Sequence, residues 1–183
     1  NAQSWREQLT PQQGGGLLLD LQSHLISTAI DCFGPAQLKY ANVNSVRGAS
    51  DDDVLLILEH ESGVVSSLAA SAISGAPGPR ARLLGDKGAV LIQELDPQEA
   101  LLRAGEYESG NKASKTILIQ GEKNQEISSI PGNYLAFYEA VFNFLNGKGQ
   151  LPVSKLLALQ VADRKSTRLN SSHMSESRMP SSA

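Results

Sequence analysis

Apolar residues recur at helical spacing in the first part of the chain. Residues 14–33 begin with three glycines, continue with leucine and isoleucine three or four positions apart, and stop at Gly34 and Pro35. This spacing places the apolar side chains on one face of an α-helix, and a Gly-Pro pair commonly ends one. We therefore predict a helix over residues 14–33 that buries one face.

The middle of the chain changes to short runs of β-branched and small residues with turn-forming residues between them. The runs occupy residues 38–46, 53–61, 63–73, 80–86 and 88–95. Such runs predict strands that follow one another in a largely antiparallel arrangement. Residues 103–131 are polar apart from the strand-like 116–120, so a loop around one further strand is predicted there.

Two more helices are predicted towards the C-terminus. Tyr134, Phe137, Val141, Phe142 and Leu145 lie at helical spacing, and a second apolar stretch begins after a proline within residues 151–161. The order helix, sheet, helix predicts an α+β fold in which helices cover a mainly antiparallel open sheet.

Composition narrows the class of protein. A length of 183 residues with 40% hydrophobic content suits one globular domain. The net charge of -3, with scattered Lys and Arg, argues against nucleic acid and membrane surfaces as partners. No apolar run approaches the roughly 20 residues of a membrane-spanning helix. Cys32 is the only cysteine, which excludes an internal disulfide and favours a cytoplasmic location.

The end of the chain differs from the rest. Residues 163–183 are rich in serine and nearly free of large apolar side chains, which predicts disorder. They also resemble a translated sequencing adapter, and we interpret them as an adapter-derived artefact. The only methionines, Met174 and Met179, lie there, and residue 1 is Asn. We expect residues 1–162 to form one domain that is truncated at both ends.

Asp20 and His24 are the candidate catalytic residues. Four positions apart on a helix, they lie about 40° from each other, and Ser27 and Asp31 continue the polar stripe. A carboxylate can orient and charge-stabilise an imidazole, whose unperturbed pKa of about 6.5 suits a proton shuttle. The alternative is structural, because a carboxylate near a helix start is favoured by the helix dipole.

The remaining polar groups have structural interpretations. No strand and G-x-G-x-x-G accompany Gly14–Gly16, so these glycines predict a flexible start to the helix rather than a dinucleotide site. His60 has no Cys or second His spaced to share a metal, and we expect it on a strand surface. Asp51–Asp53 lacks the spacing of a calcium loop and predicts a solvated turn. The Tyr134, Phe137 and Tyr138 aromatics are expected in a core or an interface.

With these residues in view, the chain resembles the C-terminal domain of the Gfo/Idh/MocA family, named for glucose-fructose oxidoreductase and inositol dehydrogenase. The resemblance covers residues 4–162 and rests on the pattern GGG-x-L-x-D-x-x-x-H at residues 14–24. The stretches PGPR, LDPQE and GNYxxFYEAV are similar to a bacterial subgroup that includes an NADP-dependent scyllo-inositol dehydrogenase.

The resemblance implies an NAD(P)-dependent dehydrogenase of a sugar or cyclic polyol. An N-terminal Rossmann domain, absent here, would bind NADP or NAD and supply a catalytic lysine, so the fragment alone is expected to be inactive. No metal is implied. Asp20 and His24 match the family's catalytic pair, with His24 exchanging the hydroxyl proton of the substrate. The sheet of this domain is expected to form a homo-oligomer.

Some residues depart from this pattern or stay open. Gln22 stands where the family generally has glycine, and a side chain there is expected to crowd the helix or the nicotinamide pocket. Trp5 and Arg6 match a family pair that lines the pocket, or they serve packing. Arg80 and the run 96–99 have family character without evident chemistry. An alternative function is a non-catalytic sheet module that mediates dimerisation, with Asp20 and His24 as a buried polar pair.

Overall fold

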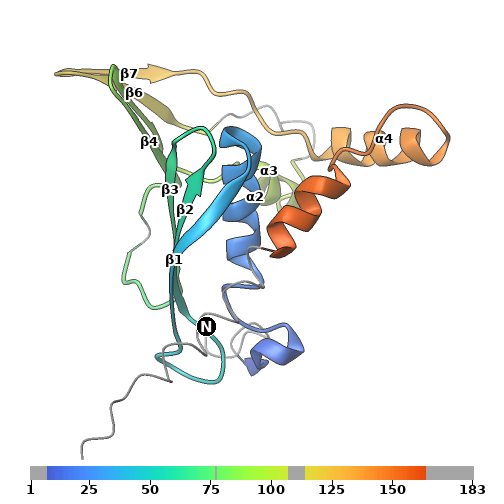
Figure 1. Cartoon of the computed structure of the whole chain (residues 1–183). Helices are drawn as coiled ribbons and strands as arrows, with labels where there is room; N and C mark the ends of the chain where they lie inside the picture. Colours follow the sequence, from blue (N-terminus) through green and yellow to red (C-terminus); the bar gives the residue numbers. More distant parts are fainter. Residues whose placement is uncertain (1–7, 77, 107–113, 164–183) are drawn as a thin grey trace, which may run out of the picture. The chain divides into compact units, whose positions relative to one another are not determined.

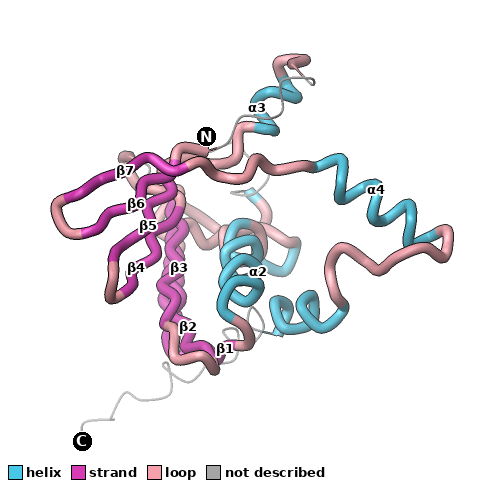
Figure 2. The backbone as a smooth tube through the Cα atoms, turned by 90° about the horizontal axis from the view of Figure 1, so that it is seen from above, coloured by secondary structure: helices cyan, strands magenta, loops and turns pink. Residues whose placement is uncertain are grey.

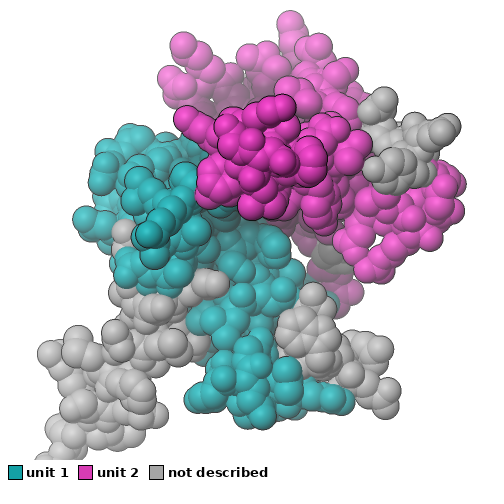
Figure 3. All heavy atoms as spheres, turned by 90° about the vertical axis from the view of Figure 1, so that its right-hand side faces the viewer, with its two compact units in different colours: residues 1–74, 153–183 teal, residues 75–152 magenta. Residues whose placement is uncertain are grey.

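The computed structural model describes residues 8–76, 78–106 and 114–163, which fall into two compact units (Figures 1 and 3). Unit 1 comprises residues 1–74 and 153–183, and unit 2 comprises residues 75–152. Each unit combines an antiparallel sheet with helices, so the predicted α+β class is confirmed. The predicted strands divide between a three-stranded sheet and a four-stranded sheet.

Unit 1 is a three-stranded sheet with one long helix against it (Figure 2). The strand order is β1-β2-β3, with both pairs antiparallel and a register shift in β1 between Leu38 and Tyr40. A further helix over residues 155–163 packs its Leu157 and Val161 on the same core. The elements are η1 (Pro11–Gln13), α2 (Leu21–Phe33), β1 (Ala36–Asn44), β2 (Asp53–His60) and β3 (Val65–Ser71).

The core of unit 1 lies between α2 and the sheet. Val54, Leu56 and Leu58 alternate along β2 and are at most 2% exposed, because alternate side chains of a strand share one face. Ile26 and Ile30 of α2 belong to the same buried cluster. At about 1.5–3 kcal/mol for each fully buried side chain, this cluster is a principal stabilising contact of the unit.

The start of α2 is held by Asp51, which precedes β2. The backbone N–H of Leu17 donates to the Asp51 carbonyl oxygen (3.1 Å), and that of Leu18 donates to the Asp51 carboxylate (2.7 Å). Gly16 has φ +94°, and a Cβ on it would lie 2.2 Å from Asp51 Oδ1. Residues 14–20 therefore form turns, and the helix begins at Leu21 rather than at residue 14.

Asp52 closes the loop between β1 and β2. Its carboxylate accepts hydrogen bonds from the backbone N–H groups of Val46 (2.8 Å) and Arg47 (2.9 Å). It also forms an ion pair with the Arg47 side chain, whose Nε lies 3.2 Å away. Burial acts to raise the pKa of Asp52, but these hydrogen bonds and the Arg47 charge together hold it below 3.8. The prediction of a solvated turn is wrong, since Asp51 and Asp52 are both buried.

Unit 2 is a four-stranded antiparallel sheet in the order β4-β5-β6-β7, with two helices. The strand β7 falls within residues 103–131, where the sequence predicts only one strand. Gln120 pairs with Lys123, so a two-residue turn at Gly121 and Glu122 joins β6 to β7. The elements are β4 (Ala81–Gly85), β5 (Gly88–Ile92), α3 (Gln98–Arg103), β6 (Thr116–Gln120), β7 (Lys123–Ile127) and α4 (Tyr134–Leu145).

Asp96 and Gln98 fix the chain at the start of α4. The Asp96 carboxylate accepts from the backbone and side-chain N–H groups of Gln98 and from the Gly132 N–H, each at 2.9 Å. Gln98 Oε1 in turn accepts from the Tyr134 N–H (2.9 Å). Burial acts to raise the pKa of Asp96, but these hydrogen bonds lower it below 3.8. The run 96–99 thus has a structural role that the sequence did not reveal.

The lowered pKa values make stability depend on pH in the acid range. Below pH 3.8, an unfolded Asp binds a proton that folded Asp52 and Asp96 do not bind. We expect the free energy of unfolding to fall as the pH drops through and below 3.8, the ordinary pKa of an Asp, until the folded carboxyls are protonated as well. Urea unfolding at several pH values measures this fall. The fall in unfolding free energy should be smaller in Asp52→Asn than in the parent. An equal fall in both would show that Asp52 does not cause the pH dependence.

The contact between Gly16 and Asp51 predicts a site where alanine is not tolerated. Gly16→Ala adds a Cβ against the Asp51 carboxylate at a positive φ, and we expect a loss of about 3 kcal/mol in unfolding free energy. Gly48→Ala is the matched control, because a Cβ there meets nothing within 4 Å. The control should stay within about 0.5 kcal/mol of the parent in urea unfolding. Equal stability of the two variants would refute the role of Gly16.

Candidate active site

Asp20 directly precedes α2, and His24 lies on the first turn of that helix. Asp20 is the N-cap residue, with φ -92° and ψ -85°, and it is half-buried. His24 is exposed one turn later, and the two positions differ by about 40° around the helix axis. Ser27 is half-buried and Asp31 exposed further along the helix. The structure therefore places the predicted pair four residues apart at the start of α2, with the His24 side chain exposed.

The backbone beneath this pair is fixed by local hydrogen bonds. The Ser23 hydroxyl donates to the carbonyl oxygens of Leu19 (3.0 Å) and Asp20 (2.5 Å), and the Gln22 N–H donates to the Leu17 carbonyl (2.9 Å). Leu17 is itself bound to Asp51. A catalytic group held on a helix in this way keeps its position better than one on a loop. The sequence pattern drew no attention to Ser23, and at Asp51 it predicted only a solvated turn.

Gln22, the departure from the family pattern, lies on the sheet side of α2. Its side chain is fully buried, and Nε2 donates to the carbonyl oxygens of Val54 (3.3 Å) and Leu68 (3.1 Å). Its Oε1 is buried without a hydrogen-bond partner in the part of the chain that the structure describes. An unpaired buried carbonyl costs about 1–3 kcal/mol. The side chain therefore occupies the space between helix and sheet.

His60 joins the end of α2 to the sheet. It is 3% exposed, with Nδ1 2.8 Å from the Gly34 carbonyl oxygen, Nε2 2.9 Å from Ser66 Oγ, and its ring edge-on to Phe33. A carbonyl oxygen only accepts, so we assign the proton to Nδ1, which leaves Nε2 to accept from the Ser66 hydroxyl in the neutral ring. The prediction of a surface position is wrong, and the role of His60 in this fold is structural.

The segment Gly14–Gly16 does not fit the phosphates of a dinucleotide. A phosphate site at a helix start needs free backbone N–H groups. Here the N–H groups of Leu17 and Leu18 already donate to Asp51, whose carboxylate would repel a phosphate. Dinucleotide binding is therefore not a property of this segment.

Within residues 8–76, 78–106 and 114–163, no group of three or more His, Cys, Asp or Glu side chains is arranged to hold a metal ion. No helix in these ranges has the length and apolar character needed to cross a membrane. Trp5 and Arg6 lie outside the described residues, as does the segment 164–183.

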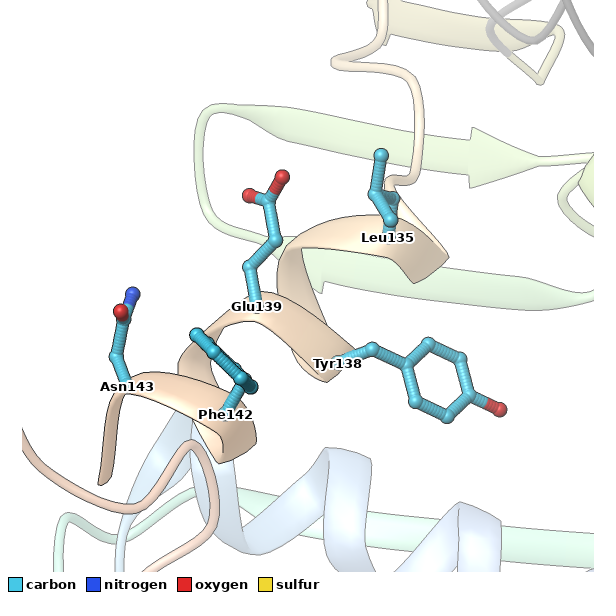
Figure 4. Close-up of a pocket in the computed structure, with 5 residues that line it drawn as sticks. All are labelled: Leu135, Tyr138, Glu139, Phe142 and Asn143. Atoms are coloured by element: carbon cyan, nitrogen blue, oxygen red, sulfur yellow. The ribbon is translucent and has the colours of Figure 1, made fainter. Parts of the chain in front are cut away.

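A hollow on α4 lies in unit 2 and is lined by one face of that helix (Figure 4). Leu135, Glu139 and Asn143 project to one side of the helix, whereas Tyr138 projects to another. Tyr134 and Phe137 are each 46% exposed and Tyr138 is 68% exposed. A core position, one of the two expectations for these aromatics, is therefore wrong, since all three are exposed.

Comparison with known proteins gives the family. A model described as the oxidoreductase family C-terminal alpha/beta domain, GFO_IDH_MocA_C, matches residues 1–162. The uncharacterized oxidoreductase YdgJ of Escherichia coli is 33% identical over an alignment of 169 residues, and the match covers 87% of this chain and 48% of that protein. The scyllo-inositol 2-dehydrogenase (NADP(+)) IolW of Bacillus subtilis is 28% identical and is matched over 44% of its length by 82% of this chain.

Solved oxidoreductase structures have the same fold as this chain. The yvaA structure from Bacillus subtilis superposes with a TM-score of 0.76 at 28% identity, covering 88% of this chain and 50% of that one. The YPO2259 structure from Yersinia pestis gives 0.78 at 26% identity, covering 99% and 53%. The chain spans about half the length of the curated relatives it matches. This chain, with its Asp-x-x-x-His pair on α2, therefore belongs to the Gfo/Idh/MocA family of oxidoreductases and matches its C-terminal domain.

Proposed function

We propose that this chain is the substrate-side part of an NAD(P)-dependent oxidoreductase that acts on a secondary alcohol of a sugar or cyclic polyol. The observation that carries the proposal is the placement of exposed His24 one turn after Asp20, on the side of α2 opposite the buried Gln22. The name of the relative IolW, a scyllo-inositol 2-dehydrogenase (NADP(+)), supports a cyclic polyol as the substrate class.

The role proposed for His24 is proton transfer. When an alcohol is oxidised, its carbon loses a hydride and its oxygen loses a proton, so a base is needed at the hydroxyl. A ring nitrogen of His24 takes this proton, and the Asp20 carboxylate stabilises the imidazolium that forms. In the reverse direction the imidazolium returns the proton to the alkoxide oxygen.

We propose that, in the full-length protein, the dinucleotide binds to a part that lies outside this chain. The N–H groups of Leu17 and Leu18 are occupied by Asp51, as described above. When bound, the nicotinamide supplies the hydride chemistry. The residues of α2 are proposed to contribute the proton path and one wall of the substrate pocket. Because the dinucleotide is proposed to bind outside this chain, we expect this chain alone to lack turnover.

The free face of the β1-β2-β3 sheet is proposed to pair with a second copy of the chain. Tyr40 pairs with Ile57, which puts both on the face opposite Val54, Leu56 and Leu58. Tyr40 is 52% exposed and Ile57 is half-buried. An exposed aromatic beside an aliphatic residue is typical of the centre of an interface.

We further propose that the domain spans residues 1–162 and that the protein is located in the cytoplasm. The family match ends at residue 162, which supports a domain over residues 1–162 and a segment 163–183 that does not belong to it. The single exposed Cys32 is compatible with a reducing cytoplasm.

Replacing His24 tests the proton shuttle. In the full-length protein, we expect His24→Ala to lower kcat for polyol oxidation by about 10²–10⁴-fold, because the hydroxyl proton loses its acceptor. Asp31→Asn is the matched control, since Asp31 is exposed on the same polar stripe, and it should keep the parent kcat. Near-normal turnover of His24→Ala would contradict the proton-transfer role of His24, whereas a full-length parent without turnover would favour the alternative of a non-catalytic sheet module.

Replacing Tyr40 tests the proposed interface. We expect Tyr40→Glu to weaken dimerisation at least about tenfold in sedimentation experiments, because it buries a charge in an apolar contact. Gln125→Glu adds the same charge at an exposed site on β7 and should leave the dimer unchanged. Unaltered dimerisation of Tyr40→Glu would show that this face of the sheet does not form the dimer interface.

A further inference from the structure

Gln22 is a buried polar residue within the contact between α2 and the β1-β2-β3 sheet. Its side chain is 0% exposed, and its Nε2 donates to the Val54 carbonyl on β2 (3.3 Å) and the Leu68 carbonyl on β3 (3.1 Å). The two acceptors belong to neighbouring strands. One amide group therefore attaches the helix to both strands.

The orientation of this amide follows from its partners. Carbonyl oxygens accept but do not donate, so the NH2 group of Gln22 must face Val54 and Leu68. Its Oε1 then points elsewhere and lies buried without a partner among the described residues. A methionine of similar length would fill the space without an unpaired oxygen. Packing alone therefore does not explain a glutamine here, whereas two directional hydrogen bonds do.

The position of Gln22 along the helix links these bonds to the candidate site. It lies two residues after Asp20 and two before His24, which places it about 160° from each around the axis. The apolar contacts of Ile26 and Ile30 favour burial but are non-directional. Directional bonds also hold the two ends of the helix, from Asp51 to Leu17 and Leu18 and from His60 to Gly34. The hydrogen bonds of Gln22 add a directional contact between the first turn of α2 and both strands.

We propose that Gln22 is a positioning residue that sets the placement of Asp20 and His24 by fixing α2 to β2 and β3. The consequence for turnover rests on the function proposed for His24. The placement of the helix does not, so the two claims can be tested separately. Gln22 touches neither the substrate nor the cofactor in this proposal.

The first experiment measures the helix itself in this 183-residue chain. Residual dipolar couplings of the backbone amides give the orientation of α2 relative to the three-stranded sheet. We expect Gln22→Met to change the couplings of residues 21–27 together, while those of the strands stay as in the parent. Ile26→Val, a buried control on the same helix, should leave them unaltered. Unchanged couplings in Gln22→Met would overturn the proposal.

The second experiment measures turnover in the full-length protein. We expect Gln22→Met to lower kcat about tenfold with an unchanged KM for the dinucleotide, because a small displacement of a catalytic group is costly. Ile26→Val should keep the parent kcat while lowering Tm by about 2–4 °C. A larger Tm loss in Gln22→Met than in Ile26→Val, or a parent kcat, would overturn the positioning role.

The outcomes also separate this proposal from the function on which it rests. If the parent oxidises no polyol, or His24→Ala keeps its turnover, the proposed function fails. Altered couplings in Gln22→Met would then still establish that Gln22 places the helix. Unaltered couplings together with a lost His24→Ala activity would instead retain the function and remove Gln22 from it.

Discussion

The attachment of Asp51 to the chain before α2 is the constraint on which the site depends. Its carbonyl and carboxylate oxygens accept the N–H groups of Leu17 and Leu18, and this contact is possible because Gly16 has no Cβ. The helix consequently begins at Leu21, with Asp20 as its N-cap residue. The apolar face of α2 then meets β2, and His24 remains exposed on the other side.

Periodicity predicted most elements, because their apolar residues follow the spacing of a helix or a strand. The run 53–61 is β2, and the aromatic stretch after residue 133 is α4. The strand β7 escaped prediction because KNQEI has little apolar alternation, and its partner β6 supplies the pairing. The start of the helix at Leu21, later than the predicted residue 14, escaped prediction because the bonds that hold residues 17 and 18 come from Asp51, far along the chain.

The candidate pair was predictable, whereas its surroundings were not. The spacing of Asp20 and His24 alone placed them on one helical turn, and the structure agrees. Burial of Asp51, Asp52 and His60 was predicted wrongly, because each is paired by groups that no local pattern reveals. Buried polar groups of this kind are stable only when hydrogen-bonded, so their positions depend on the tertiary fold.

One crystal structure would test most directly whether α2 carries the proton-transfer group of an active site. A crystal structure of the full-length protein with a nicotinamide dinucleotide and a cyclic polyol would show the reacting hydroxyl. We predict a ring nitrogen of His24 at about 2.6–3.2 Å from that oxygen, with Asp20 beside the imidazole. A substrate bound away from the first turn of α2, with another base at its hydroxyl, would contradict the account.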